Sequence, residues 1–198
     1  LTGQLTIRWA EFALNGYLNR LFGRNEWKDY VIAIDTDSLY VCLDDLVKQI
    51  NPSDPVAFLD KSATQMLEPV LDKAYNKLFE RLGGLENRMV MKREAIADRG
   101  IWTAKKRYIL NVWDSEGVRY ADAKLKIMGI EAVKSSTPAP CRTMIKEGLK
   151  VMMSGTEDEM IDYIEGCRTK FKSLPPEEIS FPRSVSNVVK YKGINTIY

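Results

Sequence analysis

Residues 31–43 are the stretch that most constrains the fold of this 198-residue chain. Nine apolar residues surround a short polar segment, Asp35-Thr36-Asp37-Ser38, in which one residue separates two carboxylates. Short apolar runs rich in Val, Ile, Leu and Tyr, interrupted by Asp, Thr and Ser, are typical of two strands joined by a tight turn. The stretch therefore predicts a β-hairpin with the polar segment at its turn.

The spacing of the two carboxylates gives them a candidate chemical role. Residues two apart on an extended chain point to the same side, so Asp35 and Asp37 are expected to share a face. Like charges held that close repel each other, and a divalent metal ion bound between them commonly offsets this repulsion. The alternative is that both are ordinary turn residues that bond nearby backbone amides. An EF-hand loop is excluded, because Leu39 and Tyr40 stand where that loop needs a ligand and a glycine.

The composition removes several other classes of function. The sequence contains no histidine, which excludes Ser-His-Asp and Cys-His catalysis and histidine-ligated metals within this chain. Its three cysteines are far apart and form no C-x-x-C motif, which favours a reduced, cytoplasmic protein. No apolar run approaches the roughly 18 residues of a membrane span, and no signal peptide is recognisable. We therefore expect no membrane partner.

Helical and strand patterns alternate along the rest of the chain. An amphipathic helix is predicted near the N-terminus, with its apolar face formed by Leu5, Trp9, Phe12, Ala13, Tyr17, Leu18 and Leu21. A second helical pattern covers residues 58–82, and Pro69 should kink or restart it. Strands are predicted over 89–91, 101–103, 108–113 and 118–120. Together these patterns indicate an α+β fold, with helices packed on an antiparallel sheet.

Positive charge is concentrated in the strand region. Residues 88–126 contain ten Lys or Arg and five Asp or Glu. Within them stands Lys105-Lys106-Arg107-Tyr108, with Trp102 and Trp113 nearby. One interpretation is a solvated strand edge, where lysines also prevent aggregation. The other is a groove that follows a nucleic-acid backbone, since cations interleaved with aromatic residues suit that role.

Taken in order, these motifs resemble the family B DNA polymerases, most closely those of T-even-like phages. Residues 34–38 look like motif C of the family's palm, and residues 105–108 look like the motif that grips the primer strand. Four further segments also read like the phage enzymes: 93–96, 111–114, 124–129 and 134–138. A D-T-D-S segment followed by K-K-R-Y is far more specific than either motif alone.

The resemblance implies a part of a polymerase. Residues 1–133 would form the C-terminal half of an α+β palm, and residues 134–198 a partial, helical thumb. The family's exonuclease, fingers, motif A aspartate and motif B lysine would lie in an N-terminal portion, in the same gene or in a separate chain. The start of the chain at Leu1, within a helical pattern, also suggests a fragment. The expected location is the cytoplasm, that of the host for a phage protein.

The resemblance also implies a mechanism and roles for single residues. Family members transfer a nucleotide from a dNTP to the 3′-hydroxyl of primer–template DNA, using two Mg²⁺ ions. Asp37 would be a direct metal ligand and Asp35 an accessory carboxylate. Glu94 matches a family carboxylate near the site, although a surface ion pair with Arg93 is an alternative.

Lys105, Lys106, Arg107 and Tyr108 would form a basic β-strand that follows the primer strand near its 3′ end. Because one hairpin supplies too few carboxylates for two metals, the chain alone is expected to be inactive. Two other functions stay open: a DNA-binding module of palm shape without chemistry, and a Mg²⁺-dependent nuclease that uses the same carboxylates.

Overall fold

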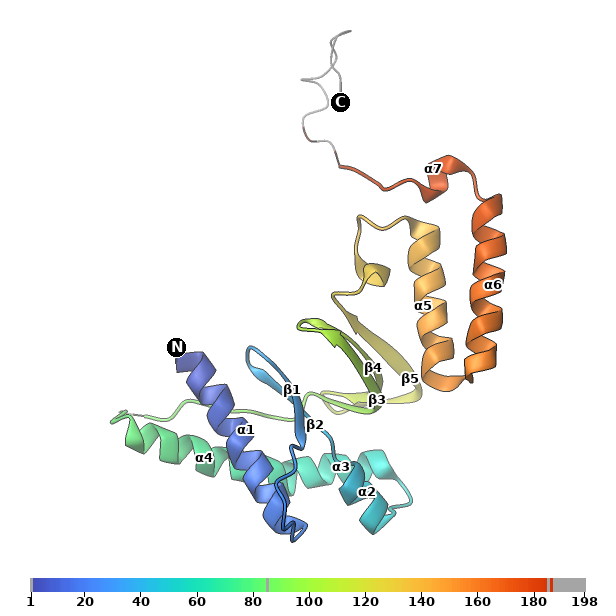
Figure 1. The fold of residues 1–198 in the computed structure, drawn as a ribbon. Coiled ribbons are helices and arrows are strands. Elements are labelled where there is room, and N and C mark those ends of the chain that lie inside the picture. The colour runs from blue at the N-terminus through green and yellow to red at the C-terminus, as the bar shows by residue number, and fades with distance from the viewer. Residues whose placement is uncertain (1, 85, 185, 187–198) are drawn as a thin grey trace. The chain divides into compact units, whose positions relative to one another are not determined.

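The computed structural model describes residues 2–84, 86–184 and 186. They divide into two compact units, residues 1–98 with 111–124, and residues 99–110 with 125–198 as far as these are described (Figure 1). Helices and antiparallel sheets are both present, which confirms the predicted α+β class. In the described ranges no helix has the length and apolar content needed to cross a bilayer. The predicted boundary between palm and thumb at 133/134 stays a prediction. The last part of the predicted thumb, residues 187–198, lies outside the described residues.

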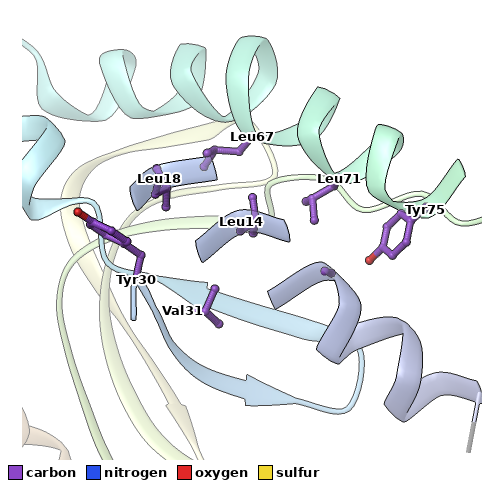
Figure 2. Packing of buried hydrophobic residues seen from close by; sticks show 8 residues of the cluster. Leu14, Leu18, Tyr30, Val31, Leu67, Leu71 and Tyr75 are labelled. Carbon is purple, nitrogen blue, oxygen red and sulfur yellow. The ribbon is translucent and has the colours of Figure 1, made fainter. Parts of the chain in front are cut away.

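The first unit is built on the predicted hairpin and two helices. Strands β1 (Val31–Asp35) and β2 (Ser38–Val41) pair antiparallel, which confirms the hairpin. Helix α1 (Thr2–Leu21) packs against α4 (Glu68–Arg81) and against β1. Figure 2 shows the core that these elements share, which consists of Ala10, Leu14, Leu18, Tyr30, Val31, Leu67, Leu71 and Tyr75.

The predicted core face of α1 was right for Leu18, which is buried, and for Tyr17, which packs against the core, but the face as a whole is shifted by a fraction of a turn. Phe12 is 66% exposed, and Leu5 and Leu21 are also exposed. The residues that enter the core are Ala10, Leu14 and Leu18, at helical spacings of four. The large side chains outside this face find other partners. Phe12 stacks on Trp27 with ring centroids 5.9 Å apart, for example. Residue size therefore misled the prediction of the face, whereas the helix itself was predicted correctly.

Pro69 restarts the second helical pattern, as predicted. Helix α3 (Pro55–Ser62) continues into a π-helical turn, η1 (Ala63–Leu67), and α4 follows. A proline has no N–H to donate and its ring crowds the carbonyl four residues earlier. The wider turn accommodates this, because the Glu68 N–H donates to the Ala63 carbonyl five residues back. The shorter helix α2 (Asp44–Ile50) precedes α3.

The second sheet has the order β3-β4-β5, formed by β3 (Ala95–Ala104), β4 (Arg107–Ser115) and β5 (Val118–Met128). Two-residue turns at 105–106 and 116–117 join neighbouring strands. The strand predicted over 89–91 is wrong. There the side chain of Asn87, and not a neighbouring strand, accepts the Met89 N–H at 3.0 Å. The predictions over 101–103 and 118–120 marked true strands but fell well short of their length.

In the second unit, the chain continues from β5 into helices. A 3₁₀ turn, η2 (Glu131–Val133), leads to α5 (Ala139–Ser154), α6 (Glu157–Ser173) and α7 (Pro176–Ile179). Its core consists of Ile109, Ile130, Ala132, Leu149 and Met153. Thr156 and Glu159 form a reciprocal capping box at the start of α6, which confirms the expectation from their spacing.

Asp45 ties the start of α2 to the loop that precedes β1. Its carboxylate accepts a hydrogen bond from the Lys28 ammonium at 2.7 Å and forms an ion pair with Arg24. The bond from Lys28, followed by the bond from Arg24, holds the pKa of Asp45 below its ordinary value. A carboxylate with a lowered pKa in the folded state stabilises that state above its unfolded pKa of about 3.9, and this contribution is lost as the pH falls further.

We therefore expect Asp45→Asn to lower the Tm at neutral pH and to show a smaller loss of Tm on acidification below about pH 4 than the wild type. Thermal unfolding followed by circular dichroism measures both quantities. Asp44→Asn is the control for removing a carboxylate from the same helical turn. The same acid-induced loss of Tm in Asp45→Asn and in the wild type would contradict this account of Asp45.

Candidate functional site

The polar segment forms the tip of the β1–β2 hairpin. Asp35 is the last residue of β1 and pairs with Ser38, the first residue of β2. Thr36 and Asp37 make the turn, and Thr36 has a positive φ of 52°. The Asp37 N–H and the Ser38 hydroxyl both donate to the Asp35 carbonyl, at 2.6 and 3.1 Å. These bonds within the turn fix the backbone that carries both carboxylates.

The two carboxylates differ in their surroundings. The Asp35 side chain is half-buried, and its Oδ1 accepts a hydrogen bond from the Thr36 hydroxyl at 3.2 Å. Asp37 is exposed, and within the described residues no hydrogen bond or ion pair engages its carboxylate. Because Asp37 lies in the turn and not on extended chain, strand alternation does not decide whether it shares a face with Asp35. The structure thus presents Asp37 to solvent and holds Asp35 closer to the fold.

Two buried asparagines on α1 hold the chain that leads into β1. The Asn15 Oδ1 accepts the backbone N–H groups of Tyr30 and Val31 at 2.8 and 3.0 Å. One turn later, Asn19 binds both backbone groups of Lys28, accepting its N–H at 2.9 Å and donating to its carbonyl at 2.8 Å. Residues 28–31 are therefore fixed to the helix four residues before Asp35.

Sequence reasoning missed these two asparagines. Their signal was present, because Asn15 and Asn19 are four residues apart and lie on the same side of α1 as Leu14 and Leu18. A polar residue on a core face must find hydrogen-bond partners, and a strand approaching without a neighbour supplies them.

Glu94 and Arg93 lie where coil leads into β3. The Arg93 guanidinium is largely buried and forms ion pairs with Asp60 of α3 and Asp114 of β4. Glu94 is exposed, and its carbonyl accepts the Glu116 N–H at 2.6 Å. Across the described residues no three carboxylates or thiols gather closely enough to hold one metal. The structure therefore does not bring Glu94 together with Asp35 and Asp37, and its predicted role stays a prediction.

The predicted basic strand is a turn followed by a strand. Lys105 and Lys106 form the exposed turn between β3 and β4, so the expectation that they lie in a strand was wrong. Lysine side chains are rarely buried, and at a hairpin tip they stay in water. Lys106 adopts a positive φ of 60°.

Arg107 and Tyr108 begin β4 and differ from the lysines. The Arg107 guanidinium donates to both carboxylate oxygens of Glu131, at 2.6 and 2.8 Å. Tyr108 is only 5% exposed, and its ring lies 6.4 Å from that of Trp102. Of the four residues predicted to follow a primer strand, the two lysines are therefore the most exposed.

We expect Asn15→Ala to destabilise the first unit and to loosen the start of β1. Each buried N–H left without a partner costs about 1–3 kcal/mol. Hydrogen exchange followed by NMR should show faster exchange at the Tyr30 and Val31 amides in this variant.

Leu14→Ala is the matched control, because it removes a neighbouring core side chain of α1 at a cost of about 2–5 kcal/mol. Below its unfolding temperature it should keep the protection pattern of Tyr30 and Val31. If both variants raise exchange at these amides equally, the specific role of Asn15 is refuted.

Comparison with known proteins gives two relatives. No protein-family model matches the chain. It is 38% identical over 203 residues to the DNA-directed DNA polymerase of Escherichia phage RB69, and 33% identical over the same length to that of Enterobacteria phage T4. Each alignment covers 96% of this chain but only 22% of the relative. The resemblance to phage DNA polymerases, as a part of a longer protein, is therefore confirmed.

Proposed function

We propose that this chain is the portion of a family B DNA polymerase that supplies one carboxylate hairpin of the catalytic centre and a grip on primer–template DNA. The observation that carries the proposal is the similarity of almost the whole chain to 22% of two phage DNA-directed DNA polymerases. The exposed Asp37 at a hydrogen-bonded turn and the exposed lysine turn are features that such a portion needs.

The residues of the hairpin fit a partial Mg²⁺ site. Mg²⁺ prefers hard oxygen ligands and keeps several waters, so it requires few protein carboxylates per ion. Asp37 would be the direct ligand and Asp35 the accessory one, with Glu94 a more distant candidate. When bound in the complete enzyme, two Mg²⁺ ions would stabilise the charge on the attacking and leaving oxygens during nucleotide transfer.

The chain's own contribution to this chemistry is geometry. The bonds from Asn15 and Asn19 fix the start of β1, and the bonds to the Asp35 carbonyl fix its end. Asp37 therefore needs little reorganisation to accept a ligand, which is how a preorganised site lowers a barrier. Because the described residues gather no third carboxylate around the hairpin, we propose that another part of the polymerase completes the site.

The DNA grip would come from the turn that carries Lys105 and Lys106. Lysines contact phosphates without reading base identity, and a polymerase must hold any sequence. The minor-groove acceptors are also nearly the same for every base pair, so cationic side chains sense duplex shape there. Tyr108, being buried, would support the turn from behind, and Arg107 would be held by Glu131.

The non-catalytic alternative, a DNA-binding module of palm shape, shares the lysine turn and differs only at the hairpin. It needs no carboxylate at position 37. Asp37 is exposed and has no partner among the described residues, which favours the catalytic proposal, since a turn aspartate with a purely local role would bond its neighbouring amides.

We expect the chain to bind a labelled primer–template duplex with an affinity that falls linearly with the logarithm of salt concentration. Lys105→Ala with Lys106→Ala should weaken binding about tenfold and reduce the salt slope by about two, because each lost phosphate contact releases roughly one counterion fewer. Fluorescence anisotropy across a salt series measures both quantities.

Lys73→Ala with Lys77→Ala on α4 is the matched control, since it removes the same charge from exposed positions of another element. Equal losses in the two double variants would show non-specific attraction only and would count against the grip at residues 105 and 106.

A further inference from the structure

The chain passes very close to the lysine turn just after β5. Gly129 has a positive φ of 67°, which favours glycine. A β-carbon built at this position would overlap the Lys106 carbonyl oxygen and lie 3.2 Å from its carbonyl carbon. No side chain fits at such distances from backbone atoms. Residue 129 can therefore be only glycine if the turn is to keep this conformation.

The residues after Gly129 fasten the same place in two further ways. Ile130 and Ala132 are buried in the second core together with Ile109 of β4. Between them, Glu131 faces the other way and accepts hydrogen bonds from Arg107 and, at 2.9 Å, from the Lys134 ammonium. The segment 129–132 thus alternates between the core and the residues that flank the turn.

The lysine turn has a conformation that requires such support. Lys106 occupies the left-handed region with φ 60°, which is costly for a residue with a side chain. Unusual backbone conformations persist only where the surroundings determine them. Segment 129–131 supplies both contacts that fix the turn. Gly129 packs against the Lys106 carbonyl, and Glu131 forms the ion pair with Arg107, the next residue.

We infer that Gly129 is a positioning residue for DNA binding. It allows segment 129–131 to pack against the backbone of the turn and so fixes the direction in which Lys105 and Lys106 leave the sheet. The inference rests on the proposed function, because it assumes that these lysines contact the DNA backbone.

The test compares two glycines that share a positive φ but differ in their surroundings. Gly117, in the β4–β5 turn, has φ 85° and nothing within 4 Å of an added β-carbon. Both Gly129→Ala and Gly117→Ala introduce backbone strain, but only Gly129→Ala pushes on the lysine turn. We expect Gly129→Ala to weaken primer–template binding about tenfold and to lower the salt slope, and Gly117→Ala to bind as the wild type does.

A combined variant separates positioning from general destabilisation. If Gly129 acts through the lysines, adding Gly129→Ala to the Lys105→Ala, Lys106→Ala pair should weaken binding no further. The inference would be overturned if Gly129→Ala weakened DNA binding by the same factor with and without the two lysines. It would also be overturned if Gly129→Ala and Gly117→Ala bound DNA equally well. If the lysine pair itself binds as the wild type does, the proposed grip fails instead.

A measurement without DNA tests whether Gly129 sets the conformation of the lysine turn. In ¹⁵N NMR spectra, Gly129→Ala should shift the backbone amides of residues 105–107, whereas Gly117→Ala should leave them in place. Should Gly129→Ala fail to fold, Glu131→Gln removes the Arg107 ion pair from the same segment without a clash and should shift the same amides. Unchanged amides there would overturn the inference.

Discussion

The hydrogen bonds from Asn15 and Asn19 to the backbone of residues 28–31 are the interaction on which the carboxylate hairpin depends. The Asn15 side chain accepts two buried backbone N–H groups, those of Tyr30 and Val31. A buried N–H without a partner costs more than its hydrogen bond contributes when it is made. These hydrogen bonds therefore determine the position of the strand more than they add to the stability of the fold. They place β1 in one position on α1, and Asp35 and Asp37 follow along a strand of five residues and a two-residue turn.

The lysine turn is held by a different principle. Its support is the absence of a side chain at Gly129, which lets one backbone pass against another, together with the Glu131 carboxylate that holds Arg107. In both places the side chains proposed to bind metal or DNA include an exposed one, and the residues that fix their backbone are polar or small. This separation suits a site that must meet a ligand without rearranging.

Local sequence patterns predicted the elements better than their faces or supports. The hairpin, the restart at Pro69 and the capping box at Thr156 depend on neighbouring residues, and all three were predicted. The core face of α1 depends on which side meets α4 and β1, so large residues such as Phe12 suggested the wrong side. Asn15 and Gly129 act through contacts with Tyr30 and Lys106, which lie 15 and 23 positions away in the sequence. Local sequence patterns do not reveal contacts at such separations. The D-T-D-S and K-K-R-Y motifs indicated the family, and the comparisons confirmed that resemblance.

The most direct test of the account is primer extension by this chain mixed with a second polypeptide that carries the parts of the phage polymerase outside the aligned 22%. With Mg²⁺, dNTPs and a labelled primer–template, we predict no extension by the chain alone and extension on mixing. Asp37→Ala should abolish that activity and Asp35→Ala should reduce it less. Extension by the chain alone, or full activity of Asp37→Ala after mixing, would contradict the proposed catalytic role. DNA cleavage by the chain alone would point to a nuclease instead.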